Sequence, residues 1–116
     1  MITSASAMPL LDDPRSVPGF DLARDERGRV TMMAEPGLMD DPRHGVQFDP
    51  QRLRRLDVTA LTIDLTRLEC VDSRLVVWML ASARALPGVP LTIRAGRRAA
   101  TQLRLLRLDR VFSITA

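Results

Sequence analysis

The stretch from Leu61 to Leu86 constrains the fold most, because it joins a strand pattern to a helix pattern through a short polar turn. It reads LTIDLTRLECVDSRLVVWMLASARAL and is followed by a Pro-Gly pair that ends a helix. The pattern predicts a strand over Ala60–Leu65 and a helix from about Arg74 to Leu86. Either Asp72 or Ser73 can accept hydrogen bonds from the free N–H groups of the first helical turn. The sequence thus predicts a hydroxyl at the positive end of a helix dipole, where a phosphate is also favoured.

The rest of the chain alternates between strand and helix patterns. Two short segments, Phe20–Glu26 and Arg29–Ala34, predict a β-hairpin that turns at Arg27-Gly28. Further predicted elements are a short helix over Pro50–Leu56, a strand over Val89–Arg94, a helix over Arg97–Leu106 with Ala99, Leu103 and Leu106 inward, and a short strand or docked tail over Val111–Ile114. The order ββαβαβα(β) predicts an α/β domain with a mixed sheet of four to five strands and helices packed on it.

The chain of 116 residues is long enough for one domain with a modest core. Residues 1–19 carry prolines and small residues without a period, which predicts a flexible arm before a folded domain over residues 20–116. The segment Glu35–Gln47 predicts a long loop. No signal-peptide pattern is present, and the longest apolar run is too short to span a bilayer, so we expect a soluble, cytoplasmic protein.

The predicted central helix has apolar residues on more than one side. A helical wheel gathers a core face of Leu75, Val76, Met79, Ala83 and Leu86. The opposite face holds Arg74, Val77, Ala81, Arg84 and Ala85, with Trp78 at its margin. Because an outward face is normally polar, Trp78 either leans over the sheet edge and is covered or belongs to a partner-binding surface that continues from Ser73.

No catalytic or metal-binding arrangement is recognisable in the sequence. The one histidine, His44, falls in the predicted loop, and no base can be assigned to Ser73. The one cysteine, Cys70, allows no intramolecular disulfide and no four-ligand zinc pattern, and we expect it to be a small buried residue. We therefore expect a protein without enzymatic activity, cofactor or bound metal.

The positive charge of the chain comes from arginine alone. The net charge is +3, and all 17 basic residues are arginines. Solvated helix faces account for most of them, an acidic protein partner is the next interpretation, and nucleic acid comes third. With no tyrosine and three phenylalanines, the chain offers few aromatic side chains for base stacking, so we expect no nucleic-acid binding.

The run from Thr62 to Leu86 resembles the core of STAS domains, named for sulfate transporters and anti-sigma-factor antagonists. That core reads as an apolar strand, a short turn, an Asp-Ser or Asp-Thr pair and a helix, with Asp72-Ser73 as the pair here. The tail LRLLRLDRVFSI is similar to the closing helix and Leu-Asp-x-Val-Phe ending of the family. Two positions depart from the pattern, since Leu75 and Arg107 stand where the family usually has glycine.

The resemblance implies a non-enzymatic switch. In antagonist members the serine matching Ser73 is phosphorylated by a kinase-type anti-sigma factor, whereas the unphosphorylated form binds that factor and frees the sigma factor. Other STAS proteins dock on the ATPase of a lipid-transport ABC complex, and a third alternative is a phosphorylation-independent signalling scaffold. The expected partner-binding residues are Asp72, Ser73, Arg74, Val77, Trp78 and Ala81. A homodimer through the same helix face is equally compatible with the sequence.

Overall fold

The part of the chain that the structure describes forms a mixed sheet of five strands in the order β1-β2-β3-β4-β5. The computed structural model describes residues 19–36, 53–54 and 57–116. The strands are β1 Phe20–Arg24, β2 Arg29–Ala34, β3 Ala60–Asp64, β4 Leu91–Arg94 and β5 Ser113–Thr115. β1 and β2 pair antiparallel, and the other three pairs are parallel. The α/β fold class predicted from the sequence is therefore confirmed.

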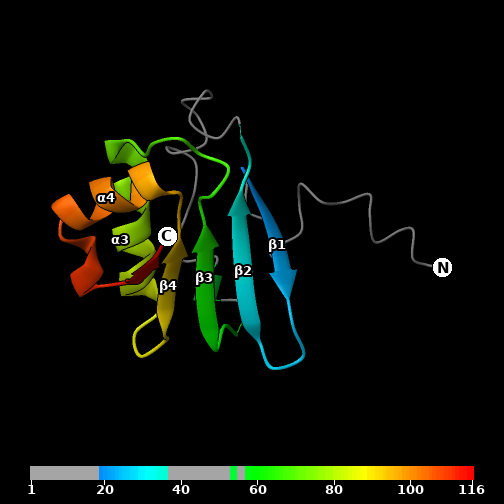
Figure 1. Ribbon diagram of the computed structural model, residues 1–116. Coiled ribbons are helices and arrows are strands. Elements are labelled where there is room, and N and C mark those ends of the chain that lie inside the picture. The colour runs from blue at the N-terminus through cyan, green and yellow to red at the C-terminus, as the bar shows by residue number, and fades with distance from the viewer. Residues whose placement is uncertain (1–18, 37–52, 55–56) are drawn as a thin grey trace.

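The helices lie on one face of this sheet (Figure 1). Between residues 57 and 116 they are α3 Ser73–Ala85 and α4 Arg97–Leu105, followed by the short 3₁₀ helix η3 Leu108–Arg110. Each α-helix connects two neighbouring parallel strands in the same direction across the sheet, and right-handed crossovers then put both on the same side. The predicted arm (1–19), loop (35–47) and first helix (50–56) lie largely outside the described residues.

Alternation along the strands gives the sheet one apolar and one polar face. Met32, Ile63, Ile93 and Ile114 are in register across four strands, and all are buried or packed against the core beneath the helices. The neighbouring register row, on the other face, runs through Ala23, Thr31, Thr62, Thr92 and Ser113. The sheet thus buries its aliphatic side chains under α3 and α4 and turns small polar residues the other way.

Gly28 closes the hairpin between β1 and β2. Its φ of +80° lies in the left-handed region, and its N–H donates to the Asp25 carbonyl at 3.1 Å. A Cβ atom at this position would come within 3.1 Å of the Asp57 carbonyl and of the Thr59 side chain. Glycine is therefore required here both by the backbone conformation and by the close approach of the segment that leads into β3.

The end of α4 differs from its predicted form. The helix ends at Leu105, and Arg107 turns the chain with φ +62°, a left-handed conformation. Leu106, expected to face inward, is the C-cap residue of α4 and is 53% exposed. Leu108 and Phe112 are buried instead and hold the closing segment against the core.

Candidate functional site

The entrance of α3 lies beyond the carboxyl end of β3, where the sequence places the Asp-Ser pair. β3 ends at Asp64, whose carboxylate accepts hydrogen bonds from the Thr66 N–H at 2.9 Å and the Thr66 hydroxyl at 2.6 Å. Burial raises the pKa of Asp64, but these bonds and the charges of Arg94 and Arg67 outweigh it, so the pKa lies below its usual value. Asp64 therefore fixes the turn that leads from the sheet toward α3.

Asp72 is the N-cap of α3. Its Oδ1 accepts from the Leu75 N–H at 3.1 Å, and its Oδ2 accepts from Arg74 Nε at 3.0 Å and Nη2 at 2.7 Å. Burial raises the pKa of Asp72. The hydrogen bonds from Arg74 and Leu75 and the charge of Arg74 outweigh that effect, so the pKa lies below its usual value. The carboxylate is thus ionised at neutral pH and is occupied by the helix on one side and by Arg74 on the other.

Ser73 is the first helical residue and is exposed. Its hydroxyl makes no hydrogen bond with the residues that the structure describes. The sequence left open whether Asp72 or Ser73 caps the helix, and the geometry assigns the cap to Asp72. The serine hydroxyl is consequently free of a structural role at the start of α3.

Gln102 of α4 holds the segment before the cap, a contact that sequence reasoning missed. Its Oε1 accepts from the Val71 N–H at 3.2 Å, and its Nε2 donates to the Val71 carbonyl at 2.7 Å. Val71 is buried, so both of its backbone groups depend on this side chain. The sequence showed only that Gln102 is a polar residue among the alanines and leucines of the predicted helix. It did not indicate that Gln102 bonds the backbone of Val71.

Trp78 belongs to the core, which corrects its expected place in a partner-binding surface. It is 4% exposed, and its ring stacks on that of Phe20 with centroids 4.9 Å apart and planes at 24°. The buried residues of α3 are Leu75, Trp78, Met79, Ser82 and Ala85. The helix is therefore rotated from the predicted orientation, so that Ala85 turns inward while Val76 and Ala83 are only partly buried.

Apart from Trp78 and the N-cap Asp72, the residues predicted to bind a partner lie on the outer side of α3. Val77 is 65% exposed, and it lies one helical turn after Ser73 on the same side of α3. Ala81, one further turn along, is half-buried, and Arg84 is exposed. We call Ser73, Arg74, Val77 and Ala81 the α3 entrance surface. It combines a free hydroxyl, a guanidinium held by Asp72, and an exposed aliphatic side chain.

Cys70 is exposed, contrary to the expectation that it is buried. It lies in the loop between β3 and α3, where Val71 rather than Cys70 turns into the core. In the part of the chain that the structure covers, no three His, Cys, Asp or Glu residues are grouped to hold a metal ion. Within the same residues, none of the helices combines the length and apolar character that crossing a membrane requires. His44 lies outside the described ranges.

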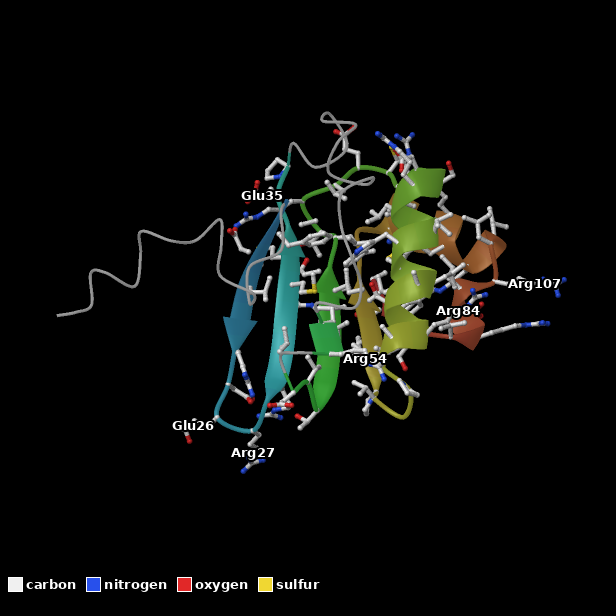
Figure 2. All side chains as sticks on the ribbon, turned by 180° about the vertical axis from the view of Figure 1, so that it is seen from behind. Glu26, Arg27, Glu35, Arg54, Arg84 and Arg107 are labelled. Carbon is white, nitrogen blue, oxygen red and sulfur yellow. The ribbon has the colours of Figure 1, made fainter. Side chains whose placement is uncertain are left out.

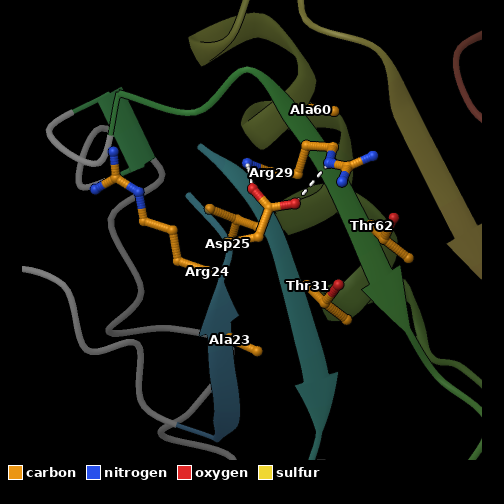
Figure 3. Close-up of a pocket in the computed structure, with 8 residues that line it drawn as sticks. Ala23, Arg24, Asp25, Arg29, Thr31, Ala60 and Thr62 are labelled. Carbon is orange, nitrogen blue, oxygen red and sulfur yellow. Dashed lines mark hydrogen bonds and ion pairs between the residues drawn. The ribbon is translucent and has the colours of Figure 1, made fainter. Parts of the chain in front are cut away.

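A shallow pocket of about 410 Å³ lies elsewhere, beside the β1–β2 hairpin (Figure 3). It is lined by Ala23, Arg24, Asp25, Arg29, Val30, Thr31, Ala60 and Thr62. The Asp25 carboxylate accepts from the backbone N–H groups of Arg29 and Arg27 and from Arg29 Nε at 2.6 Å. The Arg29 N–H bond above all holds the pKa of Asp25 below its usual value. This carboxylate therefore closes the turn and is not poised as a proton donor.

Comparison with known proteins gives no match to a family model, to a curated protein or to a solved structure.

Proposed function

We propose that the protein is a non-enzymatic, STAS-like regulatory module of the anti-sigma-factor antagonist type, switched by phosphorylation of Ser73. Its partner is then a serine kinase of the anti-sigma-factor type, bound through the α3 entrance surface. One observation carries the proposal: the exposed Ser73 hydroxyl stands free beside Asp72, which already caps the helix. A side chain without a structural role can be modified without unfolding the domain.

The local electrostatics support a switch at this position. A phosphoryl group adds about −1.5 to −2 charges and three strong acceptor oxygens. The N-terminus of α3 tolerates such charge through its dipole and its N–H groups. The neighbouring Arg74 is already bound to Asp72 Oδ2 at 2.7 Å, so a phosphate on Ser73 competes with Asp72 for the guanidinium. Phosphorylation then changes the charge pattern of the surface while the Asp72–Leu75 cap persists.

The exposed Val77 favours a second candidate function. Val77 is 65% exposed next to the site, and burying such an aliphatic side chain in a permanent contact is favourable. The alternative is a subunit that docks through the same surface on the ATPase of a lipid-transport ABC complex, without phosphorylation. A phosphorylation-independent signalling scaffold is the third alternative, and it too uses this surface.

The test is affinity capture from a lysate of the native host with wild type, Ser73→Asp and Ser113→Asp. Ser113 is an exposed serine of β5, so its variant adds the same charge away from α3. The switch predicts that wild type and Ser113→Asp capture a serine kinase of the anti-sigma-factor type, and that Ser73→Asp loses it. Peptide mass spectrometry of the wild-type bait, after its incubation in the lysate, then detects phosphate on Ser73.

Other outcomes separate the alternatives. Capture of an ABC-transporter ATPase by all three proteins supports the transport subunit and contradicts the switch. Capture of the same signalling proteins by all three, with no phosphate on Ser73, supports the scaffold. Loss of partners by Ser113→Asp as strongly as by Ser73→Asp means that added charge acts without regard to position, which contradicts a site at α3.

A further inference from the structure

The outer surface of α4 and η3 is strongly basic. Between Ser73 and Ala116 the sequence holds eight arginines and a single carboxylate, Asp109. Five of these arginines are exposed on α4, on η3 or between them, together with three exposed apolar residues. We call this set the basic face: Arg97, Arg98, Arg104, Arg107, Arg110, Leu105, Leu106 and Val111.

The arginines of the basic face are not neutralised within the described structure. None of the five forms an ion pair there, and Arg104 makes only a long contact of 3.4 Å to the Ile114 carbonyl. Four arginines elsewhere do have carboxylate partners, in the pairs Arg29–Asp25, Arg67–Asp21, Arg74–Asp72 and Arg94–Asp64. The positive charge on α4 and η3 is therefore available to an external anion.

Three apolar side chains stand among these charges. Leu105 is 79% exposed, Leu106 53% and Val111 45%. Leu105 lies seven residues after Arg98, on the side of α4 opposite the buried Ala99 and Leu103. Arg107, in its left-handed conformation, turns the chain so that Arg110 and Val111 follow on the outside. Figure 2 shows Arg107 projecting away from the body of the protein.

We propose that the basic face docks peripherally on an anionic lipid bilayer. The arginines contact headgroup phosphates, and the two leucines and Val111 enter the interfacial layer between headgroups. A surface with basic residues around apolar ones is the pattern that binds in the plane of an anionic interface. This inference does not depend on Ser73, which belongs to the α3 entrance surface.

Charge and shape favour lipid over the other polyanions. The described aromatic residues, Phe20, Trp78 and Phe112, are all buried, so nucleic acid finds no stacking platform among them. The described pocket lies beside the β1–β2 hairpin, whereas Leu105, Leu106 and Val111 are exposed on the outer surface of α4 and η3. Exposed apolar side chains among arginines can enter the interfacial layer of an anionic bilayer, which deforms around them and needs no preformed matching surface.

The test is co-sedimentation of the full chain with lipid vesicles. Vesicles of phosphatidylcholine mixed with phosphatidylglycerol are compared with vesicles of phosphatidylcholine alone, at low and at physiological salt. The variants are Arg98→Gln with Arg110→Gln, Leu105→Ser, and Arg27→Gln as the matched control. Arg27 is an exposed arginine at the hairpin turn, remote from the basic face (Figure 2). All substituted side chains are exposed, and circular dichroism checks that each variant folds.

We expect binding to the mixed vesicles alone, weaker at higher salt. Each arginine near an anionic surface contributes about a fivefold change in partitioning, so the double variant loses about 25-fold. Leu105→Ser weakens binding severalfold, and Arg27→Gln changes it little. Three results overturn the proposal. They are no binding of wild type to the mixed vesicles at low salt, a loss of binding by Arg27→Gln as large as that of the double variant, and unchanged binding by Leu105→Ser. Displacement of wild type from the vesicles by duplex RNA or by polyglutamate at equal charge also overturns it, in favour of a nucleic acid or an acidic protein.

Discussion

The entrance of α3 and the outer surface of α4 both display arginine, but they are built in opposite ways. At α3 the Asp72 carboxylate caps the helix and holds Arg74, so charges and hydrogen bonds are satisfied locally. α4 begins at Gly96 without a side-chain cap, and the arginines of the basic face have no carboxylate partner among the described residues. Paired charge thus fixes the backbone for a specific contact, whereas unpaired charge is left for a less specific anion.

The largest expected effect on the free energy of unfolding comes from replacing a large apolar residue by alanine in each of the two regions. Trp78→Ala removes a buried ring stacked on Phe20 and should lower the free energy of unfolding by about 3–5 kcal/mol. Leu105→Ala removes an exposed side chain and should change it by no more than about 0.5 kcal/mol. Urea denaturation of both variants measures these changes in the free energy of unfolding. Equal losses would contradict the division between a buried α3 face and an exposed α4 surface.

A smaller effect is expected from Gln102, which links the two helices through Val71. Gln102→Ala leaves the buried N–H and carbonyl of Val71 without their partner and should cost about 1–3 kcal/mol of unfolding free energy. Thr101→Ala is the control, since the exposed Thr101 hydroxyl bonds only the Arg97 carbonyl of its own helix. Denaturant midpoints of the two variants are compared. If they coincide, Gln102 does not hold the segment before α3.

The smallest effect is a gain, at the turn that ends the α4 region. Arg107 has φ +62°, so Arg107→Gly removes backbone strain and should raise the free energy of unfolding by up to about 1 kcal/mol. Arg110→Gly, in η3, also removes a positive charge but should destabilise by about 0.5–1 kcal/mol through added chain entropy. Thermal unfolding of the pair gives shifts of opposite sign. A loss in both would contradict the strain at Arg107.

The strands and helices were predictable because each has a clear period and clear end signals. The turn at Arg27-Gly28 placed the returning strand at Arg29–Ala34, which is β2, and the residues around Asp72 and Gly88 bounded α3. The choice between Asp72 and Ser73 as cap was not predictable, since both side chains accept from N–H groups equally well. The cap is assigned to Asp72 only by the positions of the Leu75 N–H and the Arg74 guanidinium in the folded structure.

The orientation of α3 was predicted wrongly for a related reason. Apolar residues occur at most positions around this helix, so the period alone does not determine which of them face the sheet. The decisive contact is the ring of Phe20, which comes from the first strand and is distant in sequence. Long-range contacts such as this one, and the Val71–Gln102 pair, leave no local pattern.

The most direct test of the account compares thermal unfolding of Asp72→Ala and Ser73→Asp. The central claim is that Asp72 carries the structural role at the α3 entrance and leaves Ser73 for a partner. Asp72→Ala should therefore lose about 1–2 kcal/mol as the cap is removed, while Ser73→Asp should change stability by less than about 1 kcal/mol, because the helix dipole accepts the charge. A large loss in Ser73→Asp with little loss in Asp72→Ala would make the serine the cap and contradict the account.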